Sequence, residues 1–338
     1  MPKVIETAAT PTMSQRSFAS AEHALKKKRT RREKFLAEME RVVPWARLIG
    51  VIEPLYPTSG RVGRQPMGVP KMLRMYLLQQ WYGLADEALE DAIYDSQALR
   101  DFVGIDLSRE SVPDATTLLK FRRLLEAGEL TKKMFDEINT HLHQQGLLMR
   151  AGTIVDATII VAPSSTKNAS GERDPEMHQA KKGNQWHHGM KAHIGVDAES
   201  GLVHSLVSTA ANVSDVTQAG ALLHGKETDA FGDAGYRGVG KREEAQGPQW
   251  HVAMQPGKRK VLSDSALGQM IEKVEKIKAS IRAKVEHPFH VIKNLFRHKK
   301  TRYRGLAKNH AQLYSLFGLA NLVMAKRRLM AIQGGGAS

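Results

Sequence analysis

The hydrophobic period changes once along this chain, close to Gly146. Before that glycine, apolar residues recur every three or four positions, which is typical of amphipathic helices. After it, β-branched residues gather in runs such as TIVDATIIVA at 153–162, and polar and apolar residues alternate at 186–197. Such runs predict strands. The chain therefore divides into an all-helical first part and a second part that combines strands with helices.

The first part predicts helices at 35–52, 66–84, 87–94, 115–128 and 131–144. Asp86 and Asp114 stand where helix N-caps are expected, and glycines stand at the expected helix ends. Lys120, Arg122 and Arg123 give the fourth of these helices a basic face, which suits a DNA-binding domain. A helical packing module without a DNA-binding role explains the pattern equally well.

The second part predicts strands at 153–162, 186–197, 202–209, 228–232 and 250–254. Helices are expected at 215–223, at 240–246 and from about residue 264. A hairpin followed by strand–helix units implies an α/β domain with a mixed five-stranded sheet flanked by helices. That order resembles the ribonuclease H fold.

Three carboxylates occupy unusual positions in this pattern. Asp156 lies inside an apolar strand, where an unpaired carboxylate is costly unless it binds something. Asp233 follows a strand in FGDAGYRG, where glycines allow a ligand to approach closely. Glu286 is the one acid in a basic stretch. Each could be structural by itself, but together they offer the oxygen ligands that two hard divalent ions require for phosphodiester chemistry.

The segment around Glu286 predicts a helix that packs on the sheet. Apolar residues at 281, 285, 289, 292 and 296 form one stripe at spacings of three and four. Arg282, Glu286 and Lys293 share the adjacent face, so an acid that binds metal would be flanked by cations that hold phosphates. Pro288 is expected to kink or restart this helix.

Charge and composition favour a polyanionic partner. The 338 residues hold 50 Lys and Arg against 35 Asp and Glu, a formal net charge of +15. Basic residues gather at 26–32 and at 277–308, where ten stand against Glu286 alone. A charged run is often a solvated helix face, but two blocks of one sign favour phosphate contact. The absence of cysteine excludes disulfides, thiolate catalysis and Cys-ligated zinc.

No targeting or membrane signal is evident. The first 18 residues contain no apolar core of signal-peptide length, and the longest nearly apolar stretch, 313–325, is shorter than the ~20 residues of a membrane helix. We therefore expect a cytoplasmic protein with no membrane partner, and a buried helix at 311–333.

Several segments resemble bacterial insertion-sequence transposases that carry an Asp-Asp-Glu triad, in particular the insertion-sequence-five family. The catalytic region of that family is matched by VDATII, GMKAHIGVD, AANVSD, DAGY and RAKVEHPFHVIK. Its helical N-terminal domain is matched by PWARLIGVIEPLYP, MLRMYLLQQWYGLADEALEDAIYD and PDATTLLKFRRLLE. The resemblance covers residues 35 to 325.

The resemblance implies Asp156, Asp233 and Glu286 as the catalytic, metal-binding triad, at intervals of 77 and 53 residues. It also implies Arg282 and Lys293 as the Arg-x3-Glu-x6-Lys part of the family signature. Ala279 replaces the tyrosine that often precedes this signature, which removes any role for that tyrosine here. About ten residues separate the fifth strand from the last helix, so a large insertion domain does not fit and a hairpin mechanism that needs one is disfavoured.

Further residues are candidates for DNA contact. The basic loop at 181–186 precedes the second strand, and a solvated loop is nearly as good an interpretation. Tyr236 could stack on DNA or pack in the core. Zinc is disfavoured for His178, His187, His188, His193 and His204, because no pair has the helical spacing of metalloprotease ligands. The candidate contacts are Lys120, Arg122, Arg123, Lys181, Lys182, Trp186, Lys191, His193, Tyr236, Arg237, Arg282, Lys293, Lys299, Lys300, Arg302 and Arg304.

These observations predict a basic, disordered arm at 1–34, a helical DNA-binding domain at 35–146, a ribonuclease H-like domain at 147–310 and the C-terminal helix. The predicted function is DNA transposition with Mg²⁺, for which Mn²⁺ would substitute. Double-stranded DNA, as terminal inverted repeats and target, is the expected partner of a nucleoid-associated homodimer or larger assembly. A metal-dependent nuclease without strand transfer and an inactive DNA-binding protein are the alternatives.

Overall fold

The computed structural model describes residues 25–57, 65–149, 151–169 and 171–335. Most of the expected basic arm lies outside the described residues. Its last part is helical, because Thr30 caps the first described helix by accepting a hydrogen bond from the N–H of Glu33. The helices of the first part are α2 (Arg31–Val42), α3 (Trp45–Ile52), α4 (Val69–Tyr82), α5 (Asp86–Asp95), α6 (Gln97–Val103), α7 (Ala115–Ala127) and α8 (Leu130–Gln144), with a 3-10 turn η1 (Glu53–Leu55).

Local signals explain most of these boundaries. Pro44 divides the expected helix at 35–52 into α2 and α3. Gly83 ends α4 in the left-handed conformation, and Asp114 caps α7 by accepting from the N–H of Thr117. Asp86 was expected to cap a helix, and that expectation is wrong. Its carboxylate instead pairs with Arg122 at 2.7 Å, and α5 begins at Asp86 without a side-chain cap.

The second part forms one mixed sheet of six strands, not five. The strands are β1 (Gly152–Val161), β2 (His178–Lys182), β3 (Gln185–Asp197), β4 (Val203–Ala210), β5 (Asp229–Gly232) and β6 (Gln249–Val252). Their order is β2-β3-β1-β5-β6, and β4 also pairs with β3. β3 is antiparallel to β1, β2 and β4, whereas β5 is parallel to β1 and β6. The extra strand, β2, is almost fully exposed, so no apolar alternation marks it in the sequence.

The two short helices expected between β4 and β6 are 3-10 turns. The first expected helix is replaced by η2 (Asp215–Gln218) and η3 (Gly220–Leu222), and the second by η5 (Val239–Lys241) and η6 (Glu243–Ala245). A further 3-10 turn, η4 (Ala234–Tyr236), follows β5. Glycine lets these turns pack closely, since a Cβ on Gly220 would lie 1.9 Å from the carbonyl oxygen of Glu244. Apolar side chains from the turns cover Val155 of β1 and form a small second core.

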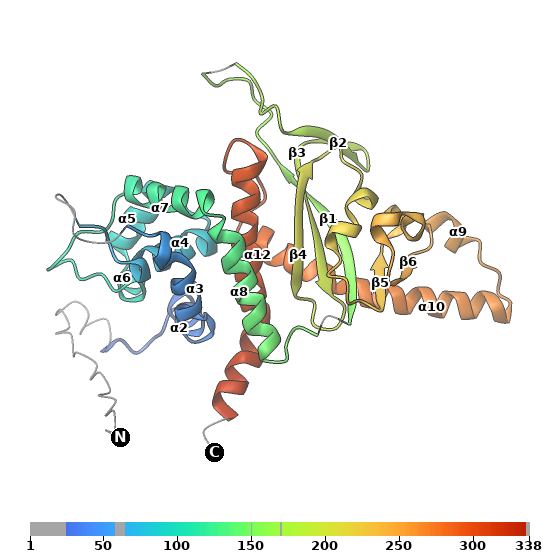
Figure 1. The fold of residues 1–338 in the computed structure, drawn as a ribbon, viewed down its shortest axis with the longest axis horizontal. Helices are drawn as coiled ribbons and strands as arrows, with labels where there is room; N and C mark the ends of the chain where they lie inside the picture. Colours follow the sequence, from blue (N-terminus) through green and yellow to red (C-terminus); the bar gives the residue numbers. More distant parts are fainter. Residues whose placement is uncertain (1–24, 58–64, 150, 170, 336–338) are drawn as a thin grey trace, which may run out of the picture.

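The chain then leaves the sheet and returns to it. After α9 (Pro256–Lys260), α10 (Ala266–Arg282) runs along one end of the molecule and exposes Leu267, Met270, Val274 and Ile277 (Figure 1). The expected single helix around Glu286 changes its winding three times. It continues as a 3-10 turn η7 (Ala283–Val285), a short α11 (Glu286–His290) and a π-helical turn η8 (Val291–Leu295).

The last helix, α12 (Leu306–Gly335), lies between α8 and the sheet (Figure 1). It begins earlier than the expected 311–333 and contacts α2, α8 and β4. One hydrophobic cluster extends from Leu36 through the sheet to Leu329, so the helical part and the strands share a core. Among the described residues, no helix combines the length and apolar character needed to cross a membrane.

Candidate active site

Strand register brings the first two carboxylates together. The parallel pairing of β1 with β5 sets Ile154 beside Phe231. Asp156 and Asp233 each lie two residues farther along, so they occupy equivalent positions at the carboxyl end of this pair. Neighbouring strands are about 4.8 Å apart, which places two acidic side chains at the same edge.

Asp156 is half-buried in β1. Its Oδ1 accepts a hydrogen bond of 2.7 Å from the N–H of Ala157. Burial, with the nearby charges of Asp233 and Glu286, raises the pKa of Asp156 to about 7, although the hydrogen bond from Ala157 N–H and the charge of Arg282 oppose the shift. The negative charge of this group is therefore poorly compensated by the protein itself.

Asp233 ends β5 at a turn that glycines make possible. Its Oδ1 accepts a hydrogen bond of 2.8 Å from the N–H of Gly235 and caps η4. A Cβ on Gly232 would lie 2.9 Å from the Cβ of Tyr236, so glycine is needed for the tyrosine to fold back over the strand. The turn leaves Asp233 half-buried.

Glu286 comes from the helical segment that packs on the sheet. Val285, Phe289, Ile292 and Phe296 of the predicted apolar stripe are buried, and Ile281 is partly buried against the same core. Glu286 is exposed on the adjacent face at the start of α11. η7 contacts β1, the strand that contains Asp156, and α10 contacts β5, the strand that precedes Asp233. The segment that contains Glu286 therefore packs against both strands.

Two cations accompany the carboxylates. Arg282 is half-buried and makes no ion pair with any described residue, and its Nε is buried without a hydrogen-bond partner. Lys293 donates from Nζ to Thr158 Oγ1 at 2.6 Å and to the carbonyl oxygen of Ile159 at 3.0 Å. Burial, with the charges of Lys182 and Lys299, lowers the pKa of Lys293, and Glu286 opposes this shift. Lys293 thus joins η8 to the strand that carries Asp156.

The donor set fits hard divalent cations such as Mg²⁺, which prefer carboxylate oxygens. The raised pKa of Asp156 supports this, because a bound cation would compensate the charge that the three acids concentrate. Their ligand atoms do not form one compact group within 4.8 Å in the described part of the chain. The charges of both other acids act on Asp156.

The structure corrects three of the expected DNA contacts. Tyr236 is 1% exposed in the second core, so it packs there and does not offer its ring for stacking. His193 is fully buried, and its Nε2 hydrogen-bonds Thr209 Oγ1 at 2.8 Å. Burial lowers the pKa of His193 to about 4, so it is neutral at pH 7. Arg122 is 7% exposed, and its guanidinium pairs with Asp86.

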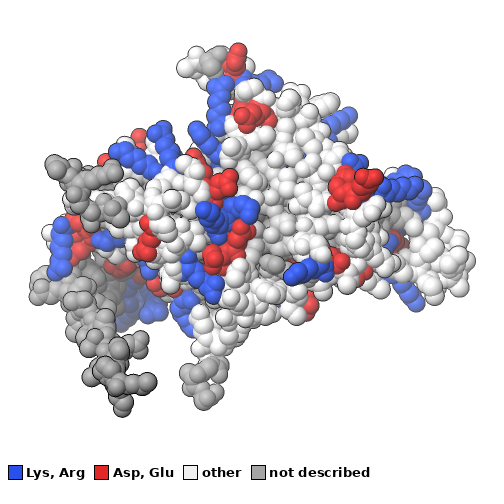
Figure 2. Space-filling model, in the orientation of Figure 1, with Lys and Arg blue, Asp and Glu red and all other residues white. Residues whose placement is uncertain are grey.

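The remaining candidates divide by exposure. Lys191 pairs with Asp215 at 2.8 Å, and Arg302 donates to the carbonyl oxygen of Leu84 at 2.9 Å. Exposed candidates are Lys120, Arg123, Lys181, Lys182, Trp186, Arg237, Lys299, Lys300 and Arg304. Figure 2 shows basic and acidic side chains interspersed over the face in view, so this face presents no single basic patch. Direct DNA contact by the exposed residues stays a prediction.

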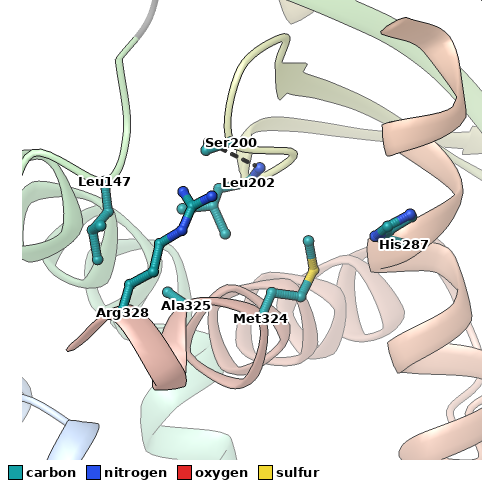
Figure 3. A pocket seen from close by; sticks show the side chains of 7 residues that line it. All are labelled: Leu147, Ser200, Leu202, His287, Met324, Ala325 and Arg328. Atoms are coloured by element: carbon teal, nitrogen blue, oxygen red, sulfur yellow. Dashed lines mark hydrogen bonds between the residues drawn. The ribbon is translucent and has the colours of Figure 1, made fainter. Parts of the chain in front are cut away.

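A pocket of about 260 Å³ lies outside this site. Met324 and Arg328 approach it from α12, His287 from α11, and Ser200 and Leu202 from the turn after β3 (Figure 3). None of the three carboxylates lines it. The geometry of the acids, not this pocket, therefore defines the candidate active site.

Sequence reasoning missed one polar group. His204, His224 and Glu227 lie close together near the start of β1. Their spacing along the sequence does not predict this contact, because it depends on the tertiary fold. His204 was considered only in pairs at helical spacing, whereas its neighbours come from a loop.

Comparison with known families agrees with the geometry. A family model described as a transposase DDE domain matches residues 148–322. A second model, described as a transposase domain (DUF772), matches residues 23–124. No solved structure matches the chain. Because the first match spans more than half of the chain and contains all three carboxylates, this protein belongs to the transposase DDE domain family.

Proposed function

We propose that this transposase binds terminal inverted repeats, cleaves DNA at the element ends and joins the freed 3′-hydroxyls to target DNA. The observation that carries this proposal is the parallel register of β1 and β5, whose last pair, Ile154 and Phe231, comes two residues before Asp156 and Asp233. The raised pKa of Asp156 in the presence of Asp233 and Glu286 supports a shared site. A specific place in the insertion-sequence-five family is also proposed, on the motifs around these residues.

Asp156, Asp233 and Glu286 would hold the Mg²⁺ ions, and Mn²⁺ would substitute. When bound, such ions activate an attacking oxygen and stabilise a leaving oxygen in phosphodiester transfer. Asp156 would be the shared ligand, because its strand β1 contacts both β5, which precedes Asp233, and η7, which precedes Glu286.

The cations of the site would position the DNA backbone. Arg282 has no ion-pair partner among the described residues, so its guanidinium can bind a phosphate beside the acids. Lys293 is held against β1 by two hydrogen bonds, which fixes a positive charge near the same edge. We assign these two residues to phosphate positioning.

The strand order supports a ribonuclease H-like catalytic domain. Three antiparallel strands, β4, β3 and β1, are followed by parallel β5 and β6, and β2 is an addition at the start of β3. Between β6 and α10 the chain has only a short segment that includes α9. No insertion domain fits there, so the proposed pathway does not use a hairpin that depends on one.

The test uses a plasmid that carries the native flanking DNA of the gene, incubated with the protein and Mg²⁺. We expect cuts at the element ends and joined products. In Glu286→Gln we expect the cleavage rate to fall by more than roughly 100-fold. Residues that only hydrogen-bond a metal ligand already cost up to roughly 100-fold when they are replaced, and a direct ligand should cost more. Asp136→Asn, an exposed acid on α8, is the matched control and should cleave normally.

Each other outcome selects an alternative. Cuts without joined products identify a metal-dependent nuclease. Binding without cuts identifies an inactive DNA-binding protein. Cleavage retained in Glu286→Gln removes this residue from the site. Joining two ends also requires at least two copies, so light scattering of the DNA complex should give a dimer or larger assembly.

A further inference from the structure

A compact group of metal-ligand side chains lies apart from the three acids. His204, His224 and Glu227 each offer a ligand atom, and these atoms all lie within 4.8 Å of one another. It is the one such group of three found in the described ranges. The rings of His204 and His224 meet edge to face, with centroids 4.9 Å apart.

The backbone is shaped to assemble this group. The pairing of β3 with β4 shifts register between Gly195 and Val196, which leaves His204 as the extra residue of a β-bulge. Bulges re-aim side chains and recur next to functional sites. A Cβ on Gly195 would lie 3.0 Å from His204 Cε1 and 2.4 Å from the carbonyl oxygen of Leu222. Glycine at 195 therefore leaves space for the ring and for the loop that carries His224.

Glu227 is the buried anion of the group. Its side chain is 1% exposed. Oε1 accepts from Thr153 Oγ1 at 3.0 Å and from the N–H of His224 at 2.6 Å. Oε2 is buried and has no hydrogen-bond partner in the part of the chain that the structure describes. Burial would raise the pKa of Glu227, but the hydrogen bond from His224 N–H and other contacts outweigh it and keep the pKa below the usual value.

A buried carboxylate with an unpaired oxygen is costly unless a cation approaches it. His224 Nε2 lies 3.4 Å from Glu227 Oε1, and His204 Nε2 lies 3.0 Å from Thr153 Oγ1. Two imidazoles and one carboxylate are borderline ligands that favour Zn²⁺ over Mg²⁺, whose preferred ligands are all oxygens.

We propose that His204, His224 and Glu227 bind one Zn²⁺ ion, with water as a fourth ligand. The site is structural. It ties the loop before β5 to the bulge of β4 and to Thr153 at the start of β1. Asp233 follows the opposite end of β5. The ion would therefore hold in place the loop that leads into β5, the strand that precedes this carboxylate. The proposal does not depend on the transposition reaction.

The experiment uses the full chain, purified without a polyhistidine tag and stripped with a chelator. Zn²⁺ is added, and bound metal is measured by elemental analysis and by competition with a chromophoric chelator. We expect one Zn²⁺ per chain, retained in millimolar Mg²⁺, and a rise in the thermal unfolding midpoint of the native protein. X-ray absorption at the zinc edge should show nitrogen and oxygen ligands at about 2.0–2.2 Å.

Variants locate the ion. Glu227→Gln and His224→Asn should each raise the dissociation constant by at least roughly 100-fold. His178→Gln, an exposed histidine on β2, is the control and should bind normally. Circular dichroism checks that each variant is folded. The rise of the unfolding midpoint with Zn²⁺ is measured on the native protein, so it tests the proposal even if a variant fails to fold. The proposal fails if the native protein binds no stoichiometric zinc, or if the variants bind it as tightly as the control.

Discussion

His298 is a buried histidine that the catalytic proposal does not use. It is 2% exposed, and neither ring nitrogen has a hydrogen-bond partner among the described residues. Burial, with the charges of Arg302 and Lys293, lowers the pKa of His298 to about 3. The ring is therefore neutral in the folded protein at pH values where the unfolded chain binds a proton.

This shift predicts acid sensitivity. A depressed pKa contributes stability that is present above the unfolded value of about 6.5 and is lost as the pH falls toward 3. Between pH 6.5 and pH 5, His298 should remove about 2 kcal/mol from the free energy of unfolding. In His298→Phe this part of the loss should disappear.

Urea unfolding at pH 5 and pH 7.5 measures the effect. His178→Gln, which changes an exposed histidine, serves as the control. An equal loss of stability on acidification in the native protein and in His298→Phe would show that other groups cause it.

At the scale of elements, the junction of α7 and α8 holds a strained residue. Glu129 has φ 50° and ψ 28° and precedes α8 without forming a side-chain cap. The left-handed conformation costs a residue with a Cβ roughly 1–2 kcal/mol, whereas glycine adopts it freely.

Glu129→Gly is therefore expected to raise the free energy of unfolding by about 1 kcal/mol. Lys133→Gly, at an exposed position inside α8, should lower it by about 1 kcal/mol because glycine disfavours a helix interior. Urea denaturation of both variants gives the comparison. Destabilisation in both would mean that the glutamate side chain outweighs the backbone strain.

The changes of winding around Glu286 belong to the same scale. A helix kinked or restarted at Pro288 was expected, but the changes lie elsewhere: a 3-10 turn precedes Glu286 and a π-helical turn contains Lys293. The apolar stripe is kept through these changes, because Val285, Phe289 and Ile292 remain buried. Packing on the sheet thus decided the winding, while the sequence pattern decided which face packs.

At the scale of the whole molecule, α12 holds the helical part and the sheet together. Asn321 is fully buried on α12. Its Oδ1 accepts from the N–H of Val203 at 2.9 Å, and its Nδ2 donates to the carbonyl oxygen of Val203 at 2.7 Å and to Asn139 of α8 at 2.9 Å. One side chain therefore joins β4 to α8.

Asn321→Ala should lower the free energy of unfolding by about 2–4 kcal/mol, because it leaves buried backbone groups of Val203 unpaired. Arg327→Ala, an exposed change on α12, is the control and should stay within about 0.5 kcal/mol. Thermal unfolding of the native protein should show one cooperative transition that is common to both parts. Two separate transitions in the native protein would instead show that the parts fold independently.

Much of the strand pattern followed from alternation and β-branched runs. The stretch of β1 around Asp156 and the strand before Asp233 were predicted from sequence, because buried strands must be apolar. β2 was missed, since an exposed hairpin needs no apolar face. The boundaries of 1–34, 35–146 and 147–310 stay a prediction, and the shared core shows that α12 packs against both parts.

The sequence by itself determined which residues are the candidates for the chemistry, because an unpaired carboxylate such as Asp156 inside an apolar strand is unfavourable unless it binds something. Only the tertiary structure decided how those residues meet. Parallel pairing brought the ends of the strands before Asp156 and Asp233 to one edge of the sheet. Packing buried Arg122, His193 and Tyr236, which the local sequence had allowed as DNA contacts. A bulge and a loop brought His204 to Glu227. Long-range pairing depends on contacts between distant segments, and local periodicity holds no information about them.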